Sequence, residues 1–296
     1  MRCLVPSLLK IAKVTPVFKS GDNFKLSNYR PISILPSVSK ILEKIMYVRL
    51  SDFISHNNIL SPHQYGFRAK RSTYMAINDL YCRITEDLNN KLNSLGIFLD
   101  LSKAFDTLNH NILLGKLNLY GIRGLANTWL ESYLSNRKQY VVYDHSKSAE
   151  SNIVCGVPQG SILGPLLFLL YINDLPLTAP NSHFIIFADD TNILFSHKDP
   201  DQLENLINNE LMNISNWFKL NKLSLNINKT NFMTFKNKHS NKPDLNFNII
   251  IDDNNIAKVD VTKFLGILID NNLSWKSHTS HICKIVSKYN GIFRKK

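Results

Sequence analysis

Two adjacent aspartates interrupt a hydrophobic stretch in the second half of the chain, and they constrain the fold more than any other feature. Residues 184–188 (FIIFA) and 191–195 (TNILF) are mainly apolar and of strand length, and only Asp189 and Asp190 separate them. This pattern predicts a strand, a tight turn and a second strand. Aspartate tolerates the unusual backbone angles of such turns, so we expect the pair to form the turn itself.

A third aspartate stands in a similar place. The apolar segment 96–99 (GIFL) has the pattern of a buried strand and ends in Asp100. A carboxylate in apolar surroundings is costly unless it is paired, so clustered carboxylates usually hold cations. Their oxygen atoms suit Mg²⁺, and two such ions about 3.5–4 Å apart can activate a hydroxyl and stabilise a leaving phosphate oxygen. The structural alternative for each aspartate is an ordinary turn or cap residue.

Composition narrows the class of protein. The 296 residues include 35 Lys and Arg against 23 Asp and Glu, a formal net charge of +12 that favours a polyanionic partner. With 44% hydrophobic and 20% charged residues the chain is not disordered. The longest apolar run, 164–172, is too short to span a membrane. Four dispersed cysteines and no convincing signal peptide favour a reduced intracellular protein, without distinguishing nucleus from cytoplasm.

Hydrophobic periodicity predicts helices and strands that do not alternate strictly, which favours an α+β fold. A loop is expected at 16–28, and a strand pair at 139–143 and 151–155. Further strands are expected at 231–235, 245–251 and 263–269. Asp199 and Pro200 have the pattern of a helix start. Helices are expected at 37–54, 72–90, 111–119, 125–134, 200–218 and from about 274 onward.

Seven blocks occur in an order that resembles the reverse transcriptases of non-LTR retrotransposons, in particular the jockey-like elements. Three of them resemble polymerase motifs A, B and C: 96–106 (GIFLDLSKAFD), 156–165 (GVPQGSILGP) and 187–190 (FADD). The others resemble fingers motifs, motif D and motif E: 16–22 (PVFKSGD) with 28–33 (NYRPIS), 64–68 (QYGFR), 221–230 (NKLSLNINKT) and 264–266 (FLG).

The resemblance implies a catalytic centre and its metal ligands. Asp100, Asp189 and Asp190 would hold two Mg²⁺ ions, with Mn²⁺ as an alternative, and the backbone carbonyl of Leu101 would be an extra ligand. Lys229 matches a motif D lysine that is sometimes described as the proton donor to pyrophosphate. The alternative for Lys229 is an exposed lysine.

The resemblance also implies a site for the incoming dNTP. Phe105, five residues after Asp100, matches an aromatic gate against the 2′ position of the sugar, and its alternative is a core phenylalanine. Gln159 and Gly160 precede a helix and would contact template or nucleotide. Lys19 and Arg30 are candidates for the triphosphate, since both offer charge that phosphate oxygens accept. We interpret Asp106 as a turn or ion-pair residue.

Template and primer are expected to lie against two further groups. Arg68, Lys70 and Arg71 are candidates for template phosphates, which supply affinity without sequence information. Phe264, Leu265 and Gly266 are expected to begin a turn that holds the primer end, although their character also suits plain packing.

The implied architecture is a right-hand polymerase with fingers (1–95), a palm (96–272, interrupted by fingers and palm helices) and the start of a truncated thumb (273–296). The implied reaction is RNA-directed DNA synthesis by a fragment of a longer protein, with an RNA template, a DNA primer and dNTPs as partners. No membrane association is expected and no protein partner can be inferred. Two alternatives remain open: an inactive or domesticated relic that binds nucleic acid, and an RNA-templated RNA polymerase, which Phe105 disfavours.

Overall fold

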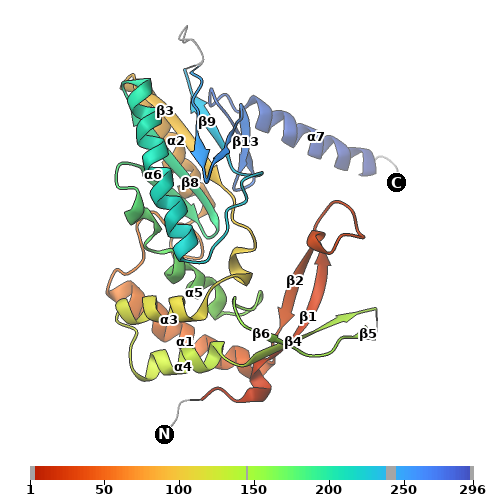
Figure 1. Ribbon diagram of the computed structural model, residues 1–296. Coiled ribbons are helices and arrows are strands. Elements are labelled where there is room, and N and C mark those ends of the chain that lie inside the picture. Colours follow the sequence, from red (N-terminus) through yellow and green to blue (C-terminus); the bar gives the residue numbers. More distant parts are fainter. Residues whose placement is uncertain (1–3, 145, 238–244, 294–296) are drawn as a thin grey trace. The chain divides into compact units, whose positions relative to one another are not determined.

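The protein, seen in a computed structural model, is described over residues 4–144, 146–237 and 245–293 (Figure 1). Its chain passes back and forth between two units. Unit 1 comprises residues 1–62, 103–174 and 220–223, and unit 2 comprises residues 63–102, 175–219 and 224–296. Each unit therefore combines segments that are distant in sequence, and each is described below by itself.

A mixed sheet in unit 2 has the strand order β12-β9-β3-β8-β7. Its middle strand, β3 (Asn93–Leu99), is buried at every position from Ser94 onward, as the continuous apolar segment predicted. Antiparallel partners lie on both sides, β8 (Asp190–His197) and β9 (Asn231–Phe235). The outer strands are β7 (His183–Phe187), antiparallel to β8, and β12 (Ala257–Lys258), parallel to β9.

Helix α2 (Thr73–Asn89) packs against β3 and β7 of this sheet, and the side chain of Ser72 caps its start by accepting a hydrogen bond from the amide of Met75. Helix α6 (Pro200–Leu220) runs alongside the strands in Figure 1. Its predicted start is confirmed, since Asp199 Oδ1 accepts hydrogen bonds from the amides of residues 201 and 202. The 3₁₀ turn η4 (Leu175–Thr178) precedes β7.

The C-terminal part of unit 2 corrects two sequence predictions. The single strand expected at 263–269 is a hairpin, β13 (Val261–Phe264) and β14 (Ile267–Asp270), because Leu265 (φ 45°) and Gly266 (φ 89°) turn the chain. The strand expected at 245–251 is present only as β10 (Ile250–Ile251), which a tight turn joins to β11 (Asn254–Asn255). Helix α7 (Lys276–Phe293) follows and contacts β14.

The sheet of unit 1 has the order β2-β1-β4-β5, with β6 also paired to β4. The antiparallel pair β1 (Ile11–Phe18) and β2 (Tyr29–Ile34) corrects the loop expected from residue 16. Pro16 faces Pro31 in this pair, beyond the positions where β1 pairs with β4, so the missing proline N–H is tolerated. The predicted strand pair is confirmed as β4 (Arg137–Tyr143) and β6 (Ser151–Ile153).

Helices α1 (Ser37–His56), α3 (His110–Leu119) and α4 (Leu125–Leu134) match their predicted segments, and α5 (Leu163–Ile172) begins within the last three residues of the motif B block. Both α1 and α3 pack against α5, which is buried on all sides. The short elements of unit 1 are η1 (Ser7–Lys10), η2 (Leu26–Asn28), η3 (Ala104–Asp106) and β5 (Ser146–Lys147).

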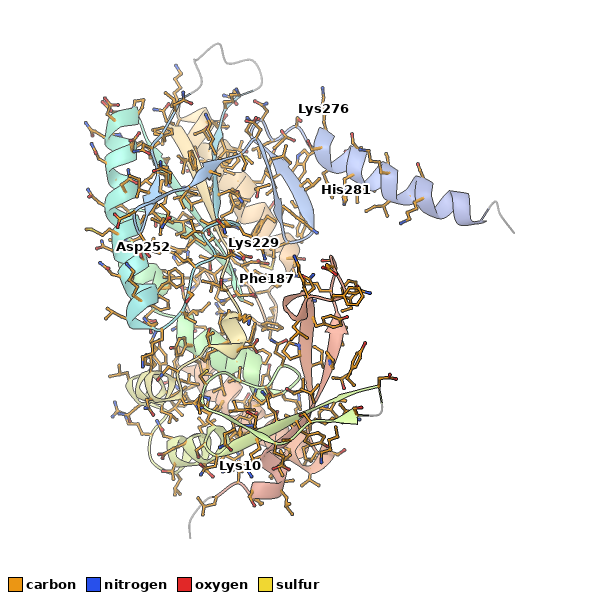
Figure 2. The ribbon with its side chains drawn as sticks, turned by 45° about the vertical axis from the view of Figure 1, so that its right-hand side comes forward. Lys10, Phe187, Lys229, Asp252, Lys276 and His281 are labelled. Carbon is orange, nitrogen blue, oxygen red and sulfur yellow. The ribbon has the colours of Figure 1, made fainter. Side chains whose placement is uncertain are left out.

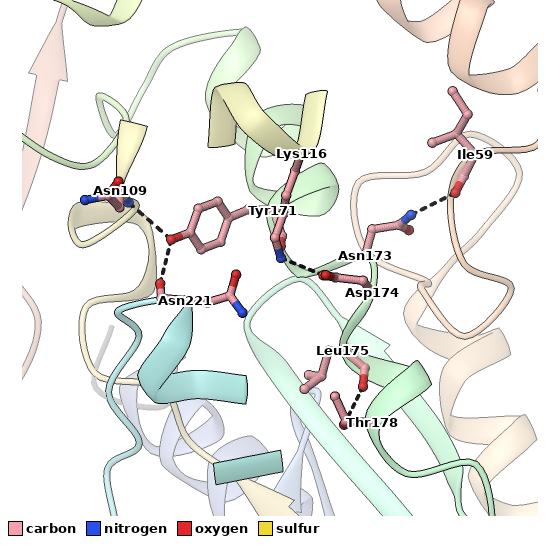
Figure 3. A network of polar contacts seen from close by, with 9 residues as sticks. All are labelled: Ile59, Asn109, Lys116, Tyr171, Asn173, Asp174, Leu175, Thr178 and Asn221. Carbon is pink, nitrogen blue, oxygen red and sulfur yellow. Dashed lines mark hydrogen bonds and ion pairs between the residues drawn. The ribbon is translucent and has the colours of Figure 1, made fainter. Parts of the chain in front are cut away.

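Polar contacts fix the C-terminal end of α5 (Figure 3). The hydroxyl of Tyr171 donates to the carbonyl of Asn221 at 2.5 Å and accepts from the amide of Asn109 at 3.3 Å. Lys116 Nζ lies 2.6 Å from Asp174 Oδ1, just beyond the helix. The helix that follows the Gln159 block is therefore held by hydrophobic packing and by hydrogen bonds together.

The mixture of helices with mainly antiparallel strand pairs confirms the α+β class. Within the described ranges no helix combines the length and the apolar character needed to cross a membrane. Units 1 and 2 are defined by packing, and the division into fingers, palm and thumb stays a prediction.

Candidate active site

The turn between β7 and β8 carries the aspartate pair. Phe187 pairs with Asp190, so Ala188 and Asp189 form a two-residue loop and Asp190 begins β8. The strand–turn–strand prediction is confirmed, but the turn lies one residue earlier than expected: Asp189 forms it with Ala188 rather than with Asp190, and the strained position is not an aspartate. Ala188 has φ 57°, which side-chain-bearing residues seldom adopt, and only 4% of its surface is exposed.

Strand register brings Asp100 to the same end of the sheet. Leu99, the last residue of β3, pairs with Thr191 of β8, so continuing the antiparallel register by one residue sets Asp100 beside Asp190. The carboxylates interact electrostatically. Desolvation by surrounding protein and the like charges of Asp189 and Asp100 raise the pKa of Asp190 to about 6.

This donor set fits a divalent cation. Carboxylate oxygens are the ligands that Mg²⁺ prefers, and a cation would relieve the repulsion that raises the Asp190 pKa. In the part of the chain that is described, no group of three or more His, Cys, Asp or Glu side chains is already gathered closely enough to hold a metal ion. The structure thus places the three carboxylates at one end of the sheet without closing them into a protein cage.

The segment after α6 holds the backbone of Asp100 in place. The Asp100 carbonyl accepts from the amide of Asn226 at 2.8 Å, and the Asp100 amide donates to Thr230 Oγ1 at 3.3 Å. Leu101, predicted as an extra ligand, is buried and forms an antiparallel bridge with Leu225. The motif D block therefore lies directly beside the motif A block.

Lys229 belongs to the same segment. Its Nζ lies 3.7 Å from Asp100 Oδ2, with 64% of the lysine side chain and 39% of the aspartate side chain exposed. Figure 2 labels Lys229 and also Phe187, the residue that precedes the turn of Ala188 and Asp189. The structure therefore brings the predicted lysine to Asp100, and its role in proton transfer stays a prediction.

Unit 1 gathers most of the residues expected to contact nucleotide. Phe105 is partly buried and stacks on Phe168, with ring centroids 4.5 Å apart. The side-chain amide of Gln159 donates to Asp106 Oδ1 at 2.8 Å. Asp106 ends the turn η3, as expected, and it also orients a predicted nucleotide-binding side chain.

The loop of Gln159 and Gly160 is joined to the strand that carries Arg30. The amide of Ser33 donates to the Gln159 carbonyl at 2.7 Å. Gly160 has φ 115°, and a Cβ there would come within 2.7 Å of the Ser33 carbonyl oxygen, so the site requires glycine. Arg30 is exposed on β2, and Lys19 is exposed just after β1. Both cations are thus available to an anionic ligand.

The residues predicted to contact template and primer lie in unit 2. Arg68 is partly buried and donates to the Gln64 carbonyl at 3.4 Å, Lys70 is exposed, and Arg71 lies over the Tyr65 ring at 4.9 Å. Phe264 is 3% exposed and meets the Phe98 ring edge-on, which matches the packing alternative for that side chain. Leu265 and Gly266 form the predicted turn and are more accessible.

Three supporting residues were not recognised from the sequence as parts of the site. Gln64 accepts a hydrogen bond from the amide of Ala188, Thr230 accepts one from Asp100, and Glu43 Oε2 accepts one from the amide of Ile162 at 2.6 Å, at the start of α5. All three side chains are buried. The sequence offered only weak signals for them: all three side chains are polar, and Gln64 and Thr230 lie within blocks that resemble reverse transcriptase motifs.

Comparison with known proteins shows similarity over most of the chain. Residues 17–269 match the family model described as reverse transcriptase (RNA-dependent DNA polymerase). The chain is 29% identical over 288 residues to the probable RNA-directed DNA polymerase from transposon X-element of Drosophila melanogaster, covering 94% of this chain and 30% of that protein. It is 30% identical to the corresponding protein of transposon BS (92% and 31% covered) and 29% identical to that of the mobile element jockey (94% and 31% covered), both from the same fly.

Solved structures agree on the fold. Apo telomerase from Candida tropicalis, truncated from its C-terminal domain, superposes with a TM-score of 0.58 at 15% identity, covering 92% of this chain and 55% of that one. The chain spans about a third of the length of the curated relatives named above. The predicted resemblance is confirmed: this chain belongs to the reverse transcriptase family, and its relatives are polymerases of jockey-like, non-LTR elements.

Proposed function

We propose that this chain carries out RNA-directed DNA synthesis, in which a primer 3′-hydroxyl attacks the α-phosphate of a dNTP and pyrophosphate leaves. The observation that carries the proposal is the meeting of Asp100 with the Asp189–Asp190 turn at one end of the unit 2 sheet. Phosphoryl transfer needs mainly positioning and neutralisation of charge, and a carboxylate cluster serves both when it holds divalent cations.

The carboxylates would act as cation ligands. Asp100, Asp189 and Asp190 would hold two Mg²⁺ ions, or Mn²⁺ in their place, together with the backbone carbonyl of Leu101. Bound cations supply charge neutralisation at the phosphate and make the primer hydroxyl a better nucleophile. Lys229, at 3.7 Å from Asp100, would deliver a proton toward the pyrophosphate.

Unit 1 residues would select and hold the nucleotide. Lys19 and Arg30 would bind the triphosphate, and Gln159 with Gly160 would contact the template or the nucleotide. The partly exposed ring of Phe105 would exclude a ribose 2′-hydroxyl, and its stacking on Phe168 supports that use by fixing the plane of the ring.

The remaining parts of the proposal concern the polymer substrates. The partners are an RNA template, a DNA primer and dNTPs, with template phosphates at Arg68, Lys70 and Arg71 and the primer end at Leu265 and Gly266. The net charge of +12 supports a polyanionic substrate. Residues 1–95 would act as fingers, 96–272 as palm and 273–296 as the start of a thumb.

Primer extension tests the proposal. The purified chain should add dTTP to oligo(dT) on poly(rA) with Mg²⁺, and Asp100→Asn should abolish extension while the far-ultraviolet circular dichroism spectrum stays unchanged. Asp174→Asn serves as a matched control, because Asp174 pairs with Lys116 and belongs to unit 1, whereas the three carboxylates belong to unit 2. Tight RNA binding by a folded chain without any extension would favour the inactive relic instead.

A further inference from the structure

We propose that Gln64 is a positioning residue that holds the Ala188–Asp189 turn in its active shape. The inference rests on the proposed function, because it assigns Gln64 a purpose through catalytic Asp189. Gln64 is not proposed to contact the primer hydroxyl, the dNTP or a metal ion. It acts on the backbone that presents the carboxylate.

A single side-chain oxygen holds the turn. The Gln64 side chain is buried, and its Oε1 accepts hydrogen bonds from the amide of Ala188 at 3.0 Å and the amide of Gly66 at 2.7 Å. Ala188 is itself buried, so without this acceptor its amide would be left unpaired in the interior. The contact therefore joins two loops that are 124 residues apart in sequence.

Backbone pairing explains how Gln64 reaches the turn. Residues 63–65 run parallel to β7 beside Ile186, whose amide donates to the His63 carbonyl at 2.9 Å and whose carbonyl accepts from the Tyr65 amide at 2.7 Å. Residues 63–65 thus extend the sheet at the outer edge of β7. From there the Gln64 side chain reaches Ala188, which lies two residues after Ile186.

Gly66 allows the close approach that the contact requires. A Cβ at Gly66 would lie 2.4 Å from the Ala188 amide nitrogen and 2.9 Å from the Phe187 carbonyl carbon. Both contacts are shorter than real Cβ atoms show. The glycine and the glutamine thus act together, one by making room at the turn and the other by bonding to it.

The conformation of the turn gives this bond its purpose. Ala188 adopts φ 57°, a left-handed conformation that an alanine leaves readily unless its surroundings enforce it. If the turn relaxed, the Asp189 carboxylate would shift relative to Asp100, and ligands of a catalytic centre must be held closely.

The chemistry of the side chain favours an amide over a carboxylate. A glutamate could accept the same two bonds, but it would add negative charge beside a cluster that already raises the Asp190 pKa. Among the described residues, Gln64 Nε2 has no hydrogen-bond partner, so the oxygen is the working end of this amide.

Two substitutions separate positioning from bulk stability. Gln64→Met keeps the volume and removes the acceptor, whereas Gln64→Glu keeps an acceptor. Glu210→Met is the matched control, because the buried Glu210 carboxylate accepts from the amide of Asn181 in another turn of unit 2. Steady-state primer extension and hydrogen exchange at single amides are measured for all three.

Gln64→Met should lower kcat about 10- to 100-fold, leave the KM for dTTP within about twofold and speed exchange at the Ala188 amide. Gln64→Glu should restore slow exchange at Ala188 and part of kcat, and Glu210→Met should change exchange at Asn181 with kcat unchanged. Wild-type kcat in Gln64→Met, or an equal kcat loss in Glu210→Met, would overturn the inference. If the wild-type chain extends no primer, the proposed function fails, and unchanged Ala188 exchange in Gln64→Met would separately refute the positioning role.

Discussion

The side-chain amide of Gln159 donates a 2.8 Å hydrogen bond to the carboxylate of Asp106, and this bond ties the motif B loop to the turn that follows motif A. The backbones of the two segments also approach each other closely. The Val157 amide donates to the Phe105 carbonyl, and a Cβ at Gly156 would collide with the backbone of Asp106. Burial raises the pKa of Asp106, and the hydrogen bond from Gln159 opposes that rise.

Asp106→Ala should therefore raise the KM for dNTP several-fold, because Gln159 loses the partner that orients its side chain. The effect on kcat should be smaller, since Asp106 holds no cation in this account. Asp106→Asn retains an oxygen acceptor and should stay near wild type. Steady-state primer extension across a dTTP series measures both, and an unchanged KM in Asp106→Ala would contradict the orienting role.

Phe105→Val should allow the enzyme to incorporate ribonucleotides, because valine leaves the space beside the sugar that the phenylalanine ring would fill. The ring stacks on Phe168 at 4.5 Å and is partly exposed, so its removal should spare the core. Phe105→Tyr keeps the ring and serves as the control. Ratios of kcat/KM for dTTP and UTP provide the measurement, and an unchanged ratio in Phe105→Val would exclude the gate.

Gly66→Ala should destabilise the fold by about 1–3 kcal/mol, because its Cβ would meet the backbone of Ala188 at 2.4 Å. For Gly115→Ala, at a glycine inside a helix, we predict the opposite effect on stability. Among the described residues, no heavy atom outside the neighbouring backbone of α3 lies within 4 Å of a Cβ at Gly115, so alanine should stabilise by up to about 1 kcal/mol. Urea unfolding compares the two variants, and equal effects would argue against the close approach at the turn.

Stability should fall as the pH drops below about 6.5, because His63 is held in its neutral form. Burial and the charge of His183 lower the pKa of His63, against the hydrogen bond to the Phe184 carbonyl and the charge of Asp79. A base with a lowered pKa in the folded state stabilises the fold above its unfolded pKa of about 6.5, and that contribution is lost as the pH falls toward the folded value.

His63→Asn should flatten this pH dependence between pH 7.5 and 5.5. The neighbouring groups Asp79, His183 and Tyr65 remain in the variant, so its changed pH dependence comes from His63 and from the charge that His63 contributes to lowering the Asp79 pKa. His56→Asn, at an exposed position in α1, should leave the dependence unchanged. Urea unfolding at several pH values gives the slopes, and identical slopes for wild type and His63→Asn would contradict the assignment.

Local sequence patterns correctly predicted the elements whose conformation depends on residues close together in the sequence. The aspartate hairpin, the strand before Asp100 and the helix start at Asp199 depend on neighbouring residues, and all three are confirmed. Periodicity predicted one strand at 263–269, whereas the family resemblance placed a turn at 264–266, because only the φ values of Leu265 and Gly266 distinguish a turn from a continued strand.

The supporting contacts could not be predicted in the same way. Thr230 reaches Asp100 across 130 residues, and Gln64 reaches Ala188 across 124. Such partners depend on strand order and register, which no short pattern encodes. The strained position also fell on Ala188, although aspartate is the residue that tolerates such angles better, because a contact from outside the turn supports it.

Single-turnover primer extension with Asp189→Asn tests the central claim most directly, and the chain offers a closely matched control. Asp253 lies in another two-residue hairpin turn of unit 2, between β10 and β11, and it is exposed. Asp189→Asn should abolish nucleotide addition while folding and RNA binding persist, and Asp253→Asn should extend primers at the wild-type rate. Wild-type addition by Asp189→Asn would contradict the assignment of a catalytic carboxylate centre to this turn.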